Sequence, residues 1–177
     1  MAEDFGYARQ YPDTVRRLVV MDDPIPGLAD WEAVKSKWPC WHFAFNALPD
    51  LPEALAAGRE LTYLGWFYGN AFQKGAISDE DARLYAKAYA RPSALHAGFE
   101  YYRAFDQDAA DNRADEGPLE MPVLALGGDR SPWRTYLHEQ LKDRASKIEG
   151  EVVPDCGHFI PEEQPEWLAR RLVEFIG

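Results

Sequence analysis

Three short apolar runs, separated by stretches of helical character, constrain the fold of this chain more than any other feature. The runs cover residues 17–21, 121–126 and 150–154, and each has the length and apolar character of a buried parallel strand. Between the first two, residues 29–112 show no strand signal and favour a series of helices. Strands that alternate with helices predict a parallel α/β sheet with a helical insertion after the first strand.

The segments around the three predicted strands are predicted to be helices. A short helix over residues 5–11 precedes the first strand, residues 131–145 form a helix between the second and third strands, and an amphipathic helix over residues 165–176 follows the third. Inside the long helical stretch we expect breaks at Pro39, Pro49, Pro52, Gly75 and Pro92. Its last helix carries one apolar face, made of Leu95, Phe99, Tyr102 and Phe105.

The order of these elements divides the chain in two. Residues 1–28 and 113–177 form a partial α/β core, and residues 29–112 form the helical insertion. Three strands are few for a sheet covered by helices on both faces, where roughly 4–6 strands are usual. We therefore expect the N-terminal strands of the sheet to be absent from this sequence.

Composition limits the partners of the chain. Its 177 residues, 46% hydrophobic and 14% aromatic, are enough for one globular unit with a sizeable core. A formal net charge of -11 argues against nucleic acid and anionic membranes, because phosphate binding needs a clustered positive face. Cys40 and Cys156 lack metal-ligand spacing, so we expect no disulfide, metal or cofactor. With neither a spanning segment nor a signal peptide, we expect a soluble, cytoplasmic chain.

The most informative polar residues are His158 and Asp22. His158 follows Gly157 in the loop between the third strand and the last helix, and Asp22 ends the first strand. The carboxyl ends of parallel strands meet at one edge of a sheet, where ligand-facing loops also lie. We therefore expect Asp22 to orient the imidazole of His158, as the acid does in a nucleophile-histidine-acid system.

Two aspartates compete with Asp22 for that role. Asp129 follows the second strand, although a turn or helix N-cap explains an aspartate there at least as well. Asp23 is the weaker alternative, because it should point elsewhere in the loop. We favour Asp22 over both.

Two more candidates lie among aromatic residues of the helical insertion. His42 belongs to the run Trp41-His-Phe-Ala-Phe45, and Tyr102 forms a pair with Tyr101. From spacing alone, a structural role in the core explains His42 and Tyr102 as well as a catalytic role does. His96 and His138 fall on polar helix surfaces and suggest no function.

Four ordered motifs together resemble a known family. They are Leu18-Val-Val-Met-Asp22-Asp-Pro-Ile-Pro26, Trp41-His-Phe-Ala-Phe45, Phe99-Glu-Tyr-Tyr-Arg-Ala104 and Asp155-Cys-Gly-His-Phe-Ile-Pro-Glu-Glu163. Across nearly the whole chain this pattern is similar to α/β-hydrolase epoxide hydrolases, particularly the bacterial group whose cap carries a His and Tyr pair. The resemblance implies an α/β-hydrolase fold in which residues 29–112 are the helical cap.

The resemblance also implies a chemistry. In that family an aspartate nucleophile attacks an epoxide carbon while two cap side chains stabilise the epoxide oxygen. By similarity those donors are His42 and Tyr102, with Tyr101 the less favoured tyrosine. A water molecule activated by His158, itself oriented by Asp22, would then hydrolyse the ester and release a diol. The expected substrate is a small apolar epoxide.

Two alternatives stay open. Haloacetate and haloalkane dehalogenases are similar in architecture and would act on a halogenated substrate. In the haloacetate enzymes the residue after the cap histidine resembles Trp, whose indole N–H can bind a halide. Here that residue is Phe43, which has no N–H. The other alternative is a non-catalytic binding remnant that has kept an apolar pocket.

The sequence departs from the family pattern at one point. The oxyanion segment and the sharp turn that presents the nucleophile should precede the first strand, and neither is recognisable. Asp4-Phe-Gly resembles that turn faintly, but no strand comes before it. We therefore expect an incomplete copy, inactive alone, whose partner is a missing N-terminal half or a second copy in a homodimer.

Overall fold

The structure is a computed structural model that describes residues 2–37, 40–114 and 117–177. Its strands are β1 (Leu18–Met21), β2 (Val123–Gly128) and β3 (Ile148–Val153). Its helices are α1 (Ala2–Gln10), α2 (Trp31–Lys35), α3 (Trp41–Asn46), α4 (Leu51–Ala56), α5 (Glu60–Tyr68), α6 (Asp79–Tyr89), α7 (Ala94–Arg103), α8 (Phe105–Ala114), α9 (Tyr136–Leu141), α10 (Ile160–Glu163) and α11 (Pro165–Ile176), with a 3-10 helix, η1, at Pro12–Thr14.

The strands form one parallel sheet in the order β1-β2-β3. Leu18 lies opposite Val123, which in turn lies opposite Ile148. The expected parallel α/β arrangement, with a helical insertion after the first strand, is confirmed. Because all three strands run in the same direction, the residues that follow Met21, Gly128 and Val153 gather at one edge of the sheet.

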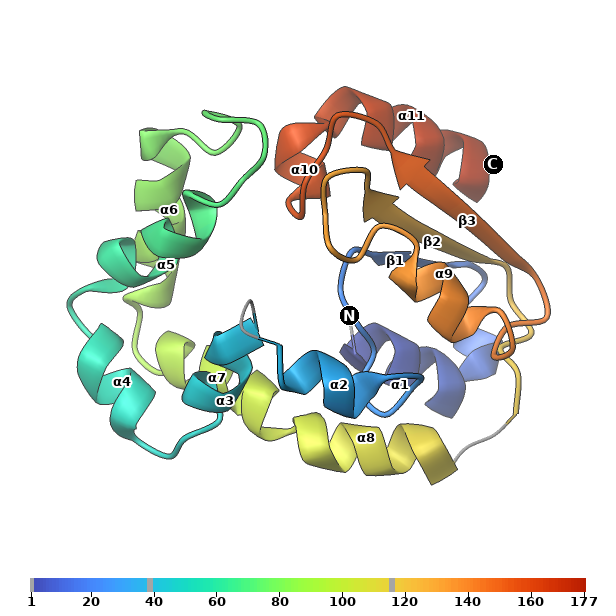
Figure 1. Ribbon diagram of the computed structural model, residues 1–177, viewed down its shortest axis with the longest axis horizontal. Coiled ribbons are helices and arrows are strands. Elements are labelled where there is room, and N and C mark those ends of the chain that lie inside the picture. The colour runs from blue at the N-terminus through green and yellow to red at the C-terminus, as the bar shows by residue number, and fades with distance from the viewer. Residues whose placement is uncertain (1, 38–39, 115–116) are drawn as a thin grey trace.

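Helices cover both faces of this sheet (Figure 1). Alternate residues of β2 point to opposite sides. Val123 packs in a cluster with side chains of α1 and α9, among them Phe5 and Leu137. Leu124 packs in another cluster with side chains of α11, including Leu168. All six residues of β2 are buried, which explains why this strand reads as a continuous apolar run.

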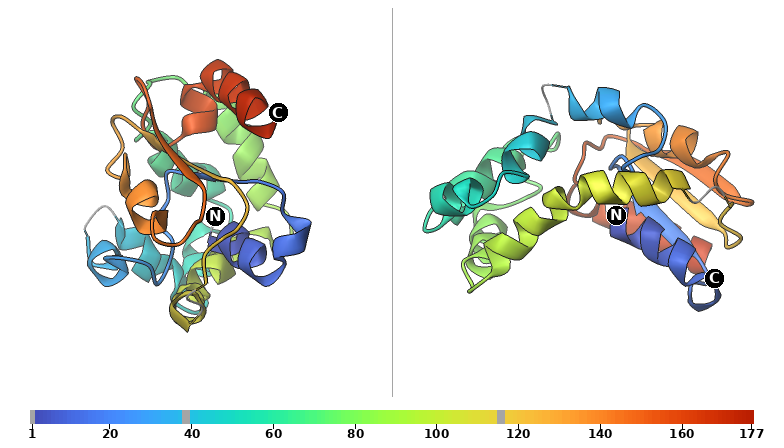
Figure 2. Two further views of the ribbon diagram at one scale, coloured as in Figure 1. Left: turned by 90° about the vertical axis from the view of Figure 1, so that its right-hand side faces the viewer. Right: turned by 90° about the horizontal axis from the view of Figure 1, so that it is seen from below.

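The helices α2 to α8 form a separate group between β1 and β2 in the sequence (Figure 1). The view from below shows α8 running from this group back to the core (Figure 2). Trp31, Phe43 and Phe105 from three of these helices pack with Trp133 of the core in one buried cluster. The helical group is therefore attached to the sheet by apolar contact as well as by its two connections.

Several predicted elements differ from the structure in their bounds, including α1, expected over residues 5–11, and β2, expected over residues 121–126. The helix expected over residues 131–145 is limited to α9, because residues 131–135 form turns. In these turns the backbone of Arg134 approaches Gly127 so closely that a Cβ on Gly127 would lie 2.1 Å from the Arg134 carbonyl oxygen. The third strand begins two residues early and ends at Val153, because Pro154 has no N–H to donate.

The expected helix breaks are mostly found between helices. Pro49, Gly75 and Pro92 lie in connections, whereas Pro52 lies in the first turn of α4, where the missing N–H is tolerated. Pro39 lies outside the described residues. The apolar face expected on one helix is shared by two, because α7 ends at Arg103 and Phe105 begins α8.

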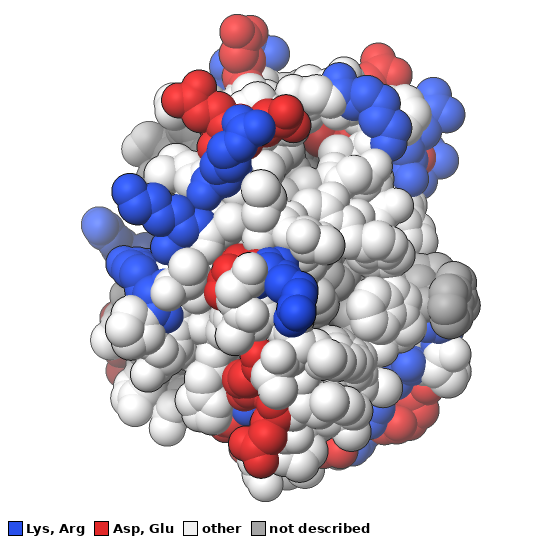
Figure 3. Space-filling view, turned by 90° about the vertical axis from the view of Figure 1, so that its left-hand side faces the viewer, with Lys and Arg blue, Asp and Glu red and all other residues white. Residues whose placement is uncertain are grey.

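The helical group exposes both charged and apolar side chains. The face in Figure 3 shows charged side chains along its top and left and in small groups near its centre and bottom, with a broad area just right of centre that shows no Lys, Arg, Asp or Glu. Large apolar side chains exposed on the helical group include Leu55, Trp66 and Leu84. Among the residues placed by the structure, no helix is long and apolar enough to cross a membrane.

We predict that Leu124→Ala destabilises the chain strongly. Leu124 is fully buried at the centre of the sheet, so its truncation should lower the free energy of unfolding by about 2–5 kcal/mol. Leu84→Ala is the matched control, since Leu84 is 61% exposed and its loss should cost less than about 0.5 kcal/mol. Urea unfolding of both variants measures the difference, and equal losses would contradict the packing described.

Candidate active site

The Asp22 carboxylate is the centre of the polar network at the carboxyl edge of the sheet. It is fully buried and follows β1 directly. Its backbone adopts the left-handed conformation, with a φ of 47°, which aspartate tolerates better than most residues. Its Oδ1 accepts from the Gly128 N–H at 2.9 Å, and its Oδ2 accepts from the Ser131 hydroxyl at 2.6 Å. These bonds compensate for burying the carboxylate.

His158 completes this network. Its Nδ1 lies 2.9 Å from Asp22 Oδ2, so the Nδ1–H donates to the carboxylate. Burial alone lowers the pKa of His158, but the hydrogen bond and negative charge of Asp22 outweigh burial, and the pKa is raised. The pairing leaves Nε2 as the ring nitrogen that can take up a proton, which is the arrangement needed in a general base.

Asp129 does not contact His158. Its Oδ1 accepts a hydrogen bond from the Cys156 N–H at 3.0 Å, and this bond lowers the pKa of Asp129. The Arg130 N–H in turn donates to the Cys156 carbonyl at 2.9 Å. Asp129 therefore ties the end of β2 to the loop before His158, and the geometry favours Asp22 as the partner of the imidazole.

Asp23 lines a pocket, and the imidazole Nδ1 is bonded by Asp22 instead. Burial raises the pKa of its carboxyl from 3.8 to about 6, although the nearby His158 opposes the rise. No hydrogen bond to this carboxylate occurs within residues 2–37, 40–114 and 117–177. Asp23 is thus a second carboxyl group at the same edge, in a less polar environment than Asp22.

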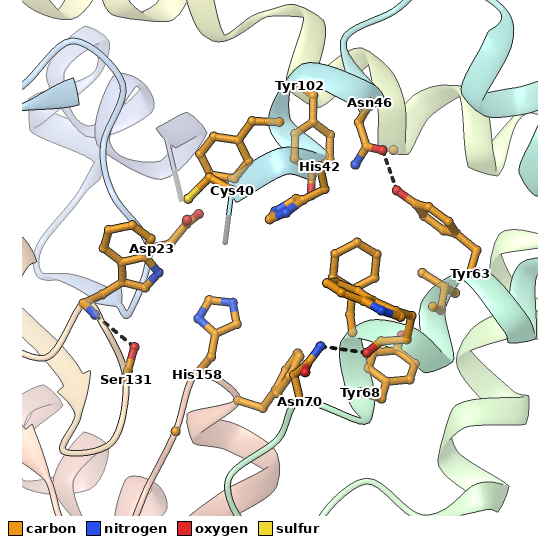
Figure 4. Close-up of a pocket in the computed structure, with 18 of the residues that line it drawn as sticks. Asp23, Cys40, His42, Asn46, Tyr63, Tyr68, Asn70, Tyr102, Ser131 and His158 are labelled. Atoms are coloured by element: carbon orange, nitrogen blue, oxygen red, sulfur yellow. Dashed lines mark hydrogen bonds between the residues drawn. The ribbon is translucent and has the colours of Figure 1, made fainter. Parts of the chain in front are cut away.

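The pocket lies between the sheet edge and the helical group and has a volume of about 760 Å³. His158 from the loop after β3 faces His42 of α3 across it (Figure 4). Aromatic side chains make up much of its wall, including Phe67, Phe99 and Trp133. A mostly apolar cavity with a few convergent polar groups is the usual form of a small-molecule site.

His42 and Tyr102 lie side by side in the wall of the pocket. Their ring centroids are 5.8 Å apart and their planes are nearly perpendicular. Burial raises the pKa of Tyr102, so its hydroxyl stays protonated and can donate. Tyr101 packs against Phe105 and does not line the pocket, so only the second tyrosine of the pair reaches it.

The sequence analysis missed several polar residues of this site. Ser131 bonds the Asp22 carboxylate, and its position in a turn gave no specific signal. Tyr63 lines the pocket and its hydroxyl donates to the side-chain oxygen of Asn46. Asn46 follows His42 by four residues on α3, and that spacing on one helical face is a sequence signal that could have indicated it.

Other candidate nucleophiles are unsuitable. Asp4 is exposed on α1 and does not line the pocket. Cys156 is buried, and burial together with nearby carboxylates raises its pKa to about 12, which keeps the thiol protonated. The residues with assigned positions contain no group of three or more His, Cys, Asp or Glu that could hold a metal ion.

The sheet order, the helical group after β1 and the site at the carboxyl edge are those of part of an α/β-hydrolase fold. No protein-family model matches the chain. A soluble epoxide hydrolase from Corynebacterium sp. (strain C12) is 28% identical over 181 residues, which are 98% of this chain and 62% of that protein.

Solved structures agree with this likeness. Cfl2 from Burkholderia cenocepacia is 38% identical and has a TM-score of 0.86, over 97% of this chain and 60% of its own. The epoxide hydrolase CorEH is 25% identical with a TM-score of 0.82, over 98% of this chain and 63% of its own. The chain is thus similar to epoxide hydrolases and spans about three fifths of the length of these relatives.

We predict that Asp22→Asn lowers the pKa of His158. The negative charge of Asp22 raises the pKa of the imidazole, whereas burial lowers it. Without that charge the effect of burial becomes larger relative to the effects that raise the pKa. Titration of the His158 ring protons by NMR measures the change. Asp129→Asn is the matched control, because Asp129 bonds the Cys156 N–H instead and should leave the His158 titration unchanged. Equal pKa changes in both variants would refute the assignment.

We also predict that Asp23→Asn stabilises the chain at high pH. Because the pKa of folded Asp23 is raised to about 6, its contribution to stability is present below pH 3.8 and is lost as the pH rises through 6. A rise of that size corresponds to at most about 3 kcal/mol. Contact with water in the pocket reduces this to about 1–2 kcal/mol.

The test compares urea unfolding of the wild type and Asp23→Asn between pH 4 and pH 8. The variant should gain stability at pH 8, and the gain should shrink towards pH 4. Asp143→Asn, at an exposed position, serves as the control and should show no such dependence. A gain of equal size at both pH values would mean that ionisation of Asp23 is not its cause.

Proposed function

We propose that the chain supplies the histidine-acid pair and the cap of a hydrolase that opens epoxides to vicinal diols. In this proposal residues 29–112 are the cap, and residues 1–28 and 113–177 belong to the core. The observation that carries it is the pocket in which His158, paired with Asp22, faces His42 and Tyr102. A base on one wall and hydrogen-bond donors on the other suit a reaction that develops negative charge on oxygen.

The first step is ring opening. An aspartate carboxylate attacks an epoxide carbon, the carbon-oxygen bond of the ring breaks, and the oxygen takes a proton as a hydroxy ester forms. Tyr102 and His42 are the donors to that oxygen in this scheme. The raised pKa of Tyr102 supports this role, since its hydroxyl keeps the proton until the alkoxide develops.

The nucleophile is proposed to come from the part of the relatives' length that this chain does not span. Asp23 is the only Asp or Glu among the described residues that line the pocket. Neither cysteine is activated, because burial raises the pKa of both thiols. The chain alone is therefore proposed to be inactive.

The second step hydrolyses the ester. His158 Nε2 takes a proton from water as the oxygen of that water attacks the ester carbonyl, and the resulting imidazolium is stabilised by Asp22. The acyl-oxygen bond then breaks, and the imidazolium returns its proton to the departing diol oxygen. The proton left on the aspartyl carboxyl group restores the Tyr102 hydroxyl that was deprotonated in ring opening, and the aspartate carboxylate is regenerated. The buried Asp22 holds the ring so that Nε2 is the nitrogen available to water.

Epoxides are favoured over halogenated substrates by the position of Phe43. Its ring is buried between Trp31 and Phe105 and offers no N–H to a leaving halide. His42 and Tyr102 are among the polar donors that line the pocket, and they suit an epoxide oxygen.

The test restores the portion that the chain does not span. The chain is mixed with, or fused to, the part of the Corynebacterium soluble epoxide hydrolase outside the 62% match, and diol formation from styrene oxide is measured. We expect turnover in the combined protein and none from either part. His158→Ala should reduce it by roughly a thousandfold, whereas His138→Ala should not.

Tyr102→Phe tests the donor role. Loss of one donor to a developing oxyanion should lower kcat by roughly a hundredfold, and Tyr101→Phe is the matched control that should retain activity. Release of fluoride from fluoroacetate, with styrene oxide unchanged, would replace the epoxide assignment by a dehalogenase. Failure of every combined protein that folds cooperatively would count against both.

A further inference from the structure

Glu163, the last residue of α10, lies beneath the loop that carries His158. The residue is only 6% exposed. Its carboxylate accepts three backbone hydrogen bonds, from Gly157 at 3.0 Å, Phe159 at 3.0 Å and Gln73 at 2.9 Å. Hydrogen bonds to an ionised acceptor are roughly twice as strong as neutral ones. A buried carboxylate with three donors is therefore a strong local constraint on the segments that donate.

The first two donors are the neighbours of His158 on either side. Glu163 Oε2 accepts from the N–H of Gly157 and Oε1 accepts from that of Phe159, so one carboxylate bonds the backbone N–H groups of both residues next to the histidine. Glycine at position 157 permits this approach, because a Cβ there would lie 2.9 Å from both Glu163 Oε1 and the Phe72 Cβ and would force one of them to shift. These two hydrogen bonds hold the backbone on either side of His158, whose imidazole bonds Asp22.

The third donor belongs to the helical group. Gln73 lies in the connection between α5 and α6, residues 69–77, and is distant in sequence from Glu163. Its side-chain N–H also donates to the Asp155 carbonyl at 2.8 Å. The neighbouring Phe72 lines the pocket and has the Arg130 guanidinium 5.4 Å from its ring centre. The 69–77 segment is thus docked on the histidine loop and forms part of the pocket wall.

We propose that Glu163 is a positioning residue that aligns His158 with Asp22 and, through the same carboxylate, docks the 69–77 segment at the pocket. One side chain then couples the orientation of the histidine to the closure of this wall. As a role in catalysis this rests on the proposed function, but the coupling itself is a property of the folded chain and can be measured without turnover.

The experiment uses the full chain and measures amide hydrogen exchange and the His158 titration by NMR. In Glu163→Gln one acceptor oxygen is replaced by a donor, so protection should fall by roughly tenfold or more at the amides that bonded that oxygen, which are either Phe159 or the pair Gly157 and Gln73. The pKa of His158 should fall as well, because a loosened loop weakens the bond to Asp22 that raises it. Glu163→Ala, which keeps no acceptor, should show larger changes in the same direction.

Glu162→Gln is the matched control. Its carboxylate accepts from the Tyr85 hydroxyl of α6 and contacts neither flanking amide, so protection at the three amides and the His158 titration should stay at wild-type values. Exchange at the β2 amides reports global stability. Glu163→Gln overturns the proposal if the three amides remain protected and His158 titrates normally, or if protection falls equally across β2. Neither the amide exchange nor the His158 titration depends on whether the combined protein hydrolyses an epoxide.

Discussion

The arrangement of the carboxyl edge depends on burying one charged group, the carboxylate of Asp22. A buried carboxylate is costly unless its oxygens are hydrogen-bonded, and here the donors come from three different segments. Gly128 ends β2, Ser131 begins the turns before α9, and His158 follows β3. Satisfying Asp22 therefore requires the ends of all three strands to be in register. The bond between Asp22 and His158 also sets the tautomer of the imidazole and raises the pKa of His158.

A second constraint is the apolar contact between the helical group and the core. The cluster of Trp31, Phe43 and Phe105 with Trp133 joins the two, and the pocket lies beside it. The low polarity of this environment raises the pKa of Tyr102 and of Asp23, with opposite consequences. It keeps a tyrosine hydroxyl available as a donor, and it makes an ionised Asp23 unfavourable. The proposed chemistry and the predicted pH dependence of stability thus have one physical origin.

Local pattern was sufficient for most of the fold. Continuous apolar runs indicated strands, and Pro165 at the start of an amphipathic stretch placed α11 at its observed bounds. The predicted helix bounds were wrong where tertiary contacts outweighed the local preference of the sequence for helix. The helix expected over residues 131–145 begins late, because Ser131 bonds Asp22 and the chain turns closely past Gly127. Neither contact has a counterpart in the local sequence.

The sequence by itself determined which residues meet, because parallel strands bring the residues after their carboxyl ends to one edge, and Asp22, Asp129 and His158 occupy those positions. Only the tertiary structure decided their pairing. The left-handed backbone at Asp22 directs its carboxylate towards His158, while Asp129 bonds the loop backbone instead. Glu163 could not be singled out from sequence, since its three donors include Gln73, 90 residues away. Side-chain direction and long-range hydrogen bonds follow from packing, which periodicity does not encode.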